Sequence, residues 1–204
     1  MAVLDDLAEY LATRQPEVYR TRYHEHDLAG AVACGPWSVA LKGRVDRVAV
    51  REGPSGIDAV LIQDFKYSGS VGRYRERLAL DALGQSSFQL PVYLYLTLLQ
   101  LAKDGYRIAP DAELHLQYLL LKDPKRKVWD AEVSRTFFEP DQVGGLSHGM
   151  QRIAELAMAG CFVPQPLESK QTCTYCSYAA LCRYWTSGAG AEAWRDQGPA
   201  DEGA

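Results

Sequence analysis

The sequence lacks three features, each of which would point to a familiar class of protein. Its 22 lysines and arginines are outnumbered by 26 aspartates and glutamates, and the net charge of −4 argues against nucleic-acid binding through overall positive charge. No run approaches the roughly 18 apolar residues that a membrane helix needs. No Gly-x-x-x-x-Gly-Lys loop is present either, which argues against ATP hydrolysis by this chain.

Cysteine is also scarce. The chain has five, and three of them are crowded into residues 173–182. Because no export signal opens the chain, we expect a cytoplasmic protein, with no membrane partner. In that compartment closely spaced thiols favour a metal or a cluster over disulfides.

What is present is an ordinary globular composition. Hydrophobic residues make up 47% of the 204 and charged residues 24%, which suits one α/β domain with a sizeable core. We assign residues 1–186 to this domain. Residues 187–204 are rich in glycine, alanine and charge, and we expect a disordered tail.

Hydrophobic periodicity predicts both helices and strands. Apolar residues recur at helical spacing in three segments: 3–13, 88–102 and 140–158. Strand patterns occur in five segments: 18–33, 38–50, 59–64, 114–121 and 128–133. The stretch 69–84, which contains Arg73, Arg75 and Arg77, reads as a mobile, charged connection.

Two neighbouring strand segments each carry one aspartate. Asp46 lies in 38–50, Asp64 ends 59–64, and a turn-forming cluster at 52–56 separates the segments. This arrangement predicts an antiparallel hairpin in which the two carboxylates lie close together.

The hairpin predicts a site for a hard cation. Residues i and i+2 of a strand share a face, so Asp64 and Lys66 point the same way. Asp46 from the neighbouring strand can share with Asp64 a cation such as Mg²⁺, which lowers the pKa of a bound water. Lys66 then orients or deprotonates that water, or stabilises the charge that develops on a phosphate. An Asp-x-Lys tripeptide alone is common, and a solvated strand edge explains most examples.

Further motifs make the pattern specific. Gly-x-x-Asp-Arg at 43–47 precedes Asp-x-Lys at 64–66, and Gln-x-x-x-Tyr at 89–93 follows on one helix face. In this order the motifs resemble the PD-(D/E)XK nuclease superfamily, and within it the RecB/AddB-type nuclease domain. The resemblance covers about residues 38–185 and implies a restriction-endonuclease-like fold, with a central mixed β-sheet flanked by α-helices.

The resemblance also implies the metal ligands. They are Asp46, Asp64 and the main-chain carbonyl of Phe65, and the metal is Mg²⁺ or Mn²⁺. The family normally adds a histidine from a helix well upstream of the Gly-x-x-Asp strand. Here two alternatives stay open: either His24 or His26 serves, although both lie in a predicted strand, or the ligand belongs to a longer parent chain.

The remaining catalytic roles follow from the same resemblance. Lys66 is implied to be the catalytic lysine. Gln89 and Tyr93 are implied to line the site and help to position DNA.

The cysteine segment, C-x₂-C-x₅-C, has spacing that lets thiolates converge on one soft centre. It resembles the RecB/AddB-like nucleases in which such a trio binds a structural 4Fe–4S cluster. The implied ligands are Cys173, Cys176 and Cys182. The fourth is open between Cys34, Cys161 and a residue outside this chain, and zinc is the rival occupant.

These features together predict a metal-dependent DNA nuclease, with exonuclease action favoured. The parent protein would act in recombination and repair, with a helicase as a subunit or as an upstream region. Two alternatives are a CRISPR spacer-acquisition nuclease with the same motifs, and a DNA-binding module on the same scaffold that does not cut.

Overall fold

The computed structural model describes residues 19–68, 71–79, 81–84, 87–122 and 128–160. The predicted helix 3–13, the cysteine segment 173–182 and the tail 187–204 lie outside the described residues. By internal contacts the chain divides into two compact units, residues 1–155 and 156–204. The assignment of one domain to residues 1–186 stays a prediction.

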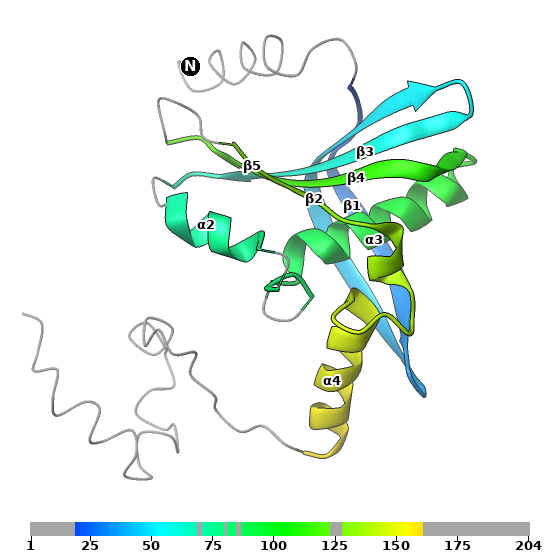
Figure 1. The fold of residues 1–204 in the computed structure, drawn as a ribbon, viewed down its shortest axis with the longest axis vertical. Helices are drawn as coiled ribbons and strands as arrows, with labels where there is room; N and C mark the ends of the chain where they lie inside the picture. The colour runs from blue at the N-terminus through cyan, green and yellow to red at the C-terminus, as the bar shows by residue number, and fades with distance from the viewer. Residues whose placement is uncertain (1–18, 69–70, 80, 85–86, 123–127, 161–204) are drawn as a thin grey trace, which may run out of the picture. The chain divides into compact units, whose positions relative to one another are not determined.

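The first unit is built on one mixed sheet, ordered β1-β2-β3-β4-β5 (Figure 1). The strands are β1 (Arg20–Cys34), β2 (Trp37–Gly53), β3 (Gly56–Lys66), β4 (Ile108–Leu120) and β5 (Val128–Glu132). Only β3 and β4 pair in parallel; the other neighbours are antiparallel. The five predicted strands and the predicted α/β class with a mixed sheet are thereby confirmed.

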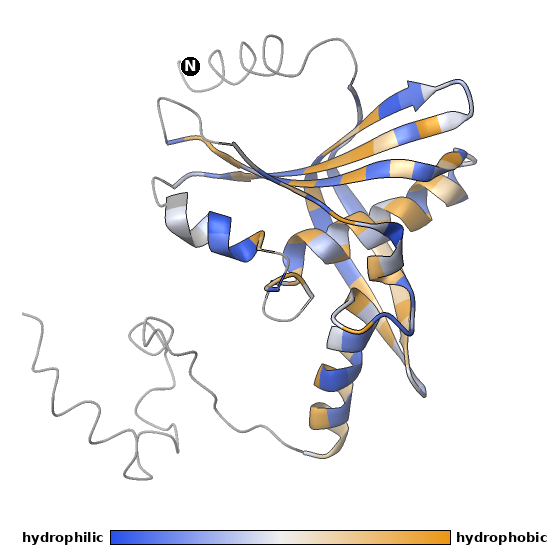
Figure 2. Cartoon of the chain, viewed as in Figure 1, coloured by the Kyte–Doolittle hydropathy of each residue, from blue (hydrophilic) through white to orange (hydrophobic). Residues whose placement is uncertain are grey.

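The parallel pair requires a long crossover, and this crossover carries helices α2 (Val71–Arg77) and α3 (Gln89–Lys103). α3 was predicted, and Pro91 lies in its first turn, where its missing N–H costs nothing. Leu94 and Leu101 are fully buried in the same core cluster as Val60 and Ile62 of β3. In Figure 2 apolar and polar segments alternate along β1 and β2, as expected for strands with one face in the core.

Helix α2 corrects the prediction of a mobile connection over 69–84. Tyr74 and Leu78, four residues apart, are buried in the core cluster that also contains residues of α3. Tyr74 in α2 and Leu78 directly after its last residue therefore anchor a short, mostly charged helix. Two apolar residues are too few to produce a recognisable helical periodicity in the sequence.

Helix α4 (Leu146–Met158) begins later than the predicted 140–158. A 3₁₀ helix, η1 (Arg135–Phe138), and turns precede it. Gly144 has a φ of 81°, which an α-helix does not accommodate, so the helix can start only after this residue. Among the described residues, no helix combines the length and the apolar character needed to cross a membrane.

Candidate active site

The two predicted carboxylates lie where β2 and β3 separate. Strand pairing at this end stops at Arg47 opposite Gln63, and Asp46 and Asp64 are the next residue of each strand. Beyond this point a side chain takes over from the main-chain hydrogen bonds between β2 and β3. Oδ2 of Asp46 accepts a hydrogen bond from the Phe65 N–H at 2.7 Å. The main chain of β3 thereby holds Asp46 beside the site.

Asp64 is the buried centre of the site, with 2% of its surface exposed. The Lys66 ammonium lies 2.5 Å from its Oδ2. The Gln89 amide donates to its Oδ1 at 2.8 Å. Apart from the ion pair, no hydrogen bond of normal geometry reaches the buried Oδ2 from the described residues. The structure therefore brings together three of the predicted side chains, with Gln89 on one oxygen of the Asp64 carboxylate and the Lys66 ammonium on the other.

The surroundings of Asp64 disfavour its negative charge. Burial is the main reason that its pKa is raised, and the nearby charge of Asp46 raises it further. The hydrogen bond and charge of Lys66, and then the charge of Arg77, oppose this shift. A cation placed between the two carboxylates would offset both unfavourable effects.

This donor set fits a hard divalent cation. Mg²⁺ commonly takes one or two carboxylates and keeps several waters. Asp46, Asp64 and the Phe65 carbonyl are all oxygen donors of that kind, and Oδ2 of Asp64 already faces a cationic partner, the Lys66 ammonium. In the described part of the chain no group of three or more His, Cys, Asp or Glu side chains gathers that could hold a metal. The predicted site therefore relies on two carboxylates and the main chain.

The helix motif and the glycine motif meet directly. A Cβ atom built on Gly43 would lie 2.6 Å from Cε1 of Tyr93, much closer than real contacts. Glycine at position 43 thus lets α3 approach β2, and one helical turn earlier the same helix presents Gln89 to Asp64. Tyr93 contacts the strand backbone here, and its predicted role in positioning DNA stays a prediction.

The upstream histidines have other surroundings. The His26 ring stacks on Tyr23 with centroids 4.6 Å apart. Within the described residues, neither His24 nor His26 joins the two aspartates in a metal-binding group. Cys34 is a free thiol buried in an apolar cluster that includes Met150. Its predicted role as a cluster ligand is untested, because Cys161 and residues 173–182 lie outside the described residues.

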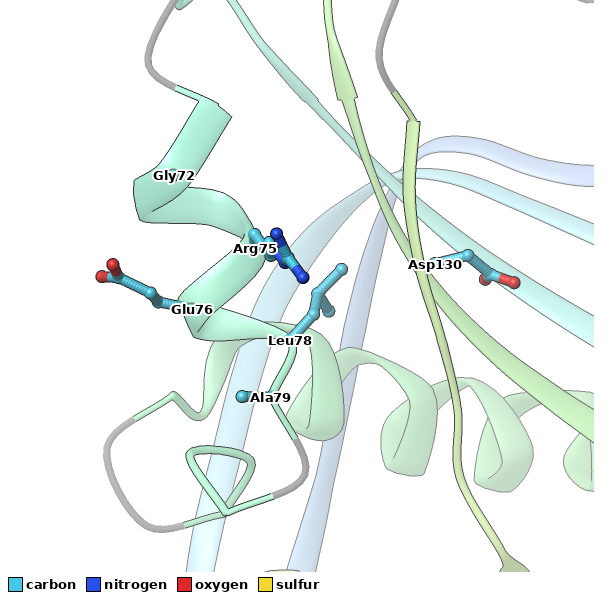
Figure 3. Close-up of a pocket in the computed structure, with 6 residues that line it drawn as sticks. All are labelled: Gly72, Arg75, Glu76, Leu78, Ala79 and Asp130. Carbon is cyan, nitrogen blue, oxygen red and sulfur yellow. The ribbon is translucent and has the colours of Figure 1, made fainter.

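A pocket lies between α2 and β5 (Figure 3). Its lining residues are Gly72, Arg75, Glu76, Leu78, Ala79 and Asp130. Arg75 and Leu78 point toward the sheet, and Glu76 points the opposite way. None of the predicted catalytic residues lines this pocket, so it is a feature separate from the carboxylate site.

One residue of the site is missing from the sequence prediction. Tyr118 of β4 pairs with Asp64 in the parallel register and is 1% exposed. Burial raises the pKa of its hydroxyl, and the charge of Asp64 raises it further. A tyrosine inside an apolar strand reads as a core residue, so only the pairing of β3 with β4 could have identified it.

Comparison with known proteins identifies the family of the chain. A family model described as the PD-(D/E)XK nuclease superfamily matches residues 2–183. The chain belongs to this superfamily, which confirms that part of the predicted resemblance and makes it a member of a family of nuclease hydrolases.

Other comparisons add less. No curated protein matches the chain. Seven chains of solved structures match. One, described as "Crystal structure of SSO0001", has a TM-score of 0.42 and 15% identity, over 89% of this chain and 66% of that one. The chain therefore spans slightly less than two thirds of that protein.

Replacing Asp64 should change how stability depends on pH. Because the folded-state pKa is raised, the contribution of Asp64 to stability is fully present below its unfolded pKa, near pH 4, and is lost as the pH rises through the folded pKa. The free energy of unfolding of Asp64→Asn, relative to wild type, should therefore increase between about pH 4 and pH 7. Urea unfolding without divalent cations measures this difference. A difference that stays constant across this pH range would contradict the burial effect.

The contact between Gly43 and Tyr93 predicts an energetic coupling. Gly43→Ala should destabilise the fold by about 1–3 kcal/mol, because the new methyl group overlaps the ring. In a double-mutant cycle with Tyr93→Leu, the double variant should cost at least ~0.5 kcal/mol less than the sum of the single variants. Gly72→Ala is the matched control, since nothing lies within 4 Å of its Cβ position. Additive effects at 43 and 93 would show that this contact does not constrain α3.

Proposed function

We propose that this chain is a Mg²⁺- or Mn²⁺-dependent deoxyribonuclease, the nuclease domain of a RecB/AddB-like recombination and repair protein. The observation that carries the proposal is the buried Asp64, ion-paired to Lys66 and held by Gln89 beside Asp46. Membership of the nuclease superfamily supports it. So does the order of the three motifs, which resembles this branch.

Each residue then has a defined task. Asp46, Asp64 and the Phe65 carbonyl hold the metal, which supplies a water of lowered pKa and neutralises charge on the phosphate. Gln89 donates to Oδ1 of Asp64 and so fixes the orientation of this carboxylate.

The Lys66 ammonium pairs with Oδ2 of Asp64 at 2.5 Å. A divalent cation held by the carboxylates would compete for this oxygen and would release the ammonium toward the substrate. There it orients or deprotonates the attacking water, or stabilises charge on the phosphate.

DNA can reach the site despite the net negative charge of the chain. Helix α2 carries Arg75 and Arg77 in its last turn, and the charge of Arg77 acts on Asp64. We assign Arg77 to a contact with a backbone phosphate next to the scissile one, since such contacts position DNA without reading sequence. Exonuclease action, DNA as the substrate and a helicase partner belong to this proposal.

Two alternatives use the same residues. The spacer-acquisition nuclease shares the motifs and the chemistry. The DNA-binding module would retain the scaffold without cutting. A buried, unfavourable carboxylate beside a lysine argues against the second alternative, because a binding module gains nothing from the cost of that charge.

Digestion of labelled linear DNA tests the proposal. Wild-type protein with Mn²⁺ should degrade single- or double-stranded DNA, and Asp64→Ala and Lys66→Ala should each reduce the rate at least about 100-fold. Asp111→Ala, the same type of change at the opposite end of β4 from Tyr118, should cut normally. Circular dichroism checks that all variants fold. Equal cutting by all four proteins would reject the assignment, and binding without cutting by wild type would favour the DNA-binding module.

We further propose that Cys173, Cys176 and Cys182 hold a 4Fe–4S cluster, with zinc as the rival. Protein purified without oxygen should contain iron and acid-labile sulfide, and Cys176→Ser should lose both. Zinc in place of iron, with no broad visible absorbance, would reject the cluster.

A further inference from the structure

Tyr118 lies next to Asp64 in the sheet. It stands opposite Asp64 in the parallel register of β3 and β4. Its ring packs against the Tyr74 ring at 5.1 Å between centroids, and the Lys66 ammonium lies 5.9 Å from its ring centroid. A tyrosine at this point extends above the sheet on the same face as Asp64 and Lys66.

The Tyr118 hydroxyl is buried and makes no hydrogen bond of normal geometry with the described residues. The side chains of Ser87 and Arg77 lie within hydrogen-bonding range and lower the pKa of the hydroxyl, but neither makes a hydrogen bond of normal geometry with it. Buried hydroxyls almost always have a partner, because leaving one unpaired is costly. A phenylalanine would fill the same volume without that cost, so the retained hydroxyl points to a group that is not part of the protein.

A second buried polar atom belongs to the residue paired with Tyr118. Oδ2 of Asp64 is buried, and its partner among the described residues is the Lys66 ammonium at 2.5 Å. The hydroxyl and this oxygen belong to register-paired residues, which indicates one polar binding position between β3 and β4. A hydrated cation suits it, since Mg²⁺ and Mn²⁺ sites retain waters whose hydrogen atoms need acceptors.

We propose that Tyr118 is a positioning residue for the cation site, with its hydroxyl oxygen accepting a hydrogen bond from a water of the cation held by Asp46 and Asp64. The inference rests on the proposed function and adds to it a residue outside the family's motifs.

Tyr118→Phe removes this hydroxyl alone. It should weaken Mn²⁺ binding about tenfold, the lower end for an outer-sphere partner, as measured by calorimetry without DNA. Its thermal midpoint without metal should equal or exceed that of wild type, because the hydroxyl satisfies no protein group. Thr97→Val is the matched control: it too removes a buried, unpartnered hydroxyl, and Mn²⁺ affinity should be unchanged.

Two results would overturn the inference. One is wild-type Mn²⁺ affinity in Tyr118→Phe. The other is a lower thermal midpoint of that variant without metal, which would mean that the hydroxyl makes a structural bond. Asp64→Asn separates this inference from the proposed function. If Asp64→Asn loses Mn²⁺ and Tyr118→Phe does not, only the role of Tyr118 fails; if Asp64→Asn keeps Mn²⁺ affinity, the proposed metal site itself is wrong.

Discussion

A carboxylate enclosed in the sheet is the constraint on which the rest of the site depends. Asp64 follows an apolar strand and is as inaccessible as the leucines around it. Such a charge is tolerated only with partners, and here these are the ammonium of Lys66 and the amide of Gln89. Both are bound to Asp64, so the negative charge organises the residues that surround it.

Hydrogen bonds on the opposite face of the sheet hold the strands in register at the level of the site. Gln63 and Arg47, the neighbours of the two aspartates, point to that face. There the Arg47 guanidinium donates to the Gln63 amide oxygen, and the Gln63 amide donates to Gln117 of β4. Arg47 also donates to the Thr21 hydroxyl of β1 at 2.9 Å. A row of polar side chains thus joins four strands at the level of the site and holds their register. A slip of one residue in this register would turn the carboxylates to the opposite face of the sheet.

The sequence predicted those parts of this arrangement that depend on local pattern. The strands around Asp46 and Asp64, and the helix that carries Gln89, follow from alternation and helical spacing. Tyr118 could not be predicted, because its place beside Asp64 arises from a parallel pairing between segments far apart in the chain. Helix α2 could not be predicted because only Tyr74 and Leu78 anchor it. The start of α4 could not be predicted because the positive φ of Gly144, which excludes it from the helix, is not visible in the sequence.

The parallel pairing of β3 and β4 explains why one face collects so many functional groups. A chain that ends β3 at Lys66 and begins β4 in parallel must cross the sheet, and α2 and α3 make that crossing. Their core residues pack on the face that carries Asp64, so the crossing brings Gln89 and Arg77 close to the carboxylate. Gly43 then sets how near α3 can come. The site is therefore a consequence of topology. With an acidic residue near the end of β3, the crossover helices supply the groups that bind this residue and balance its charge.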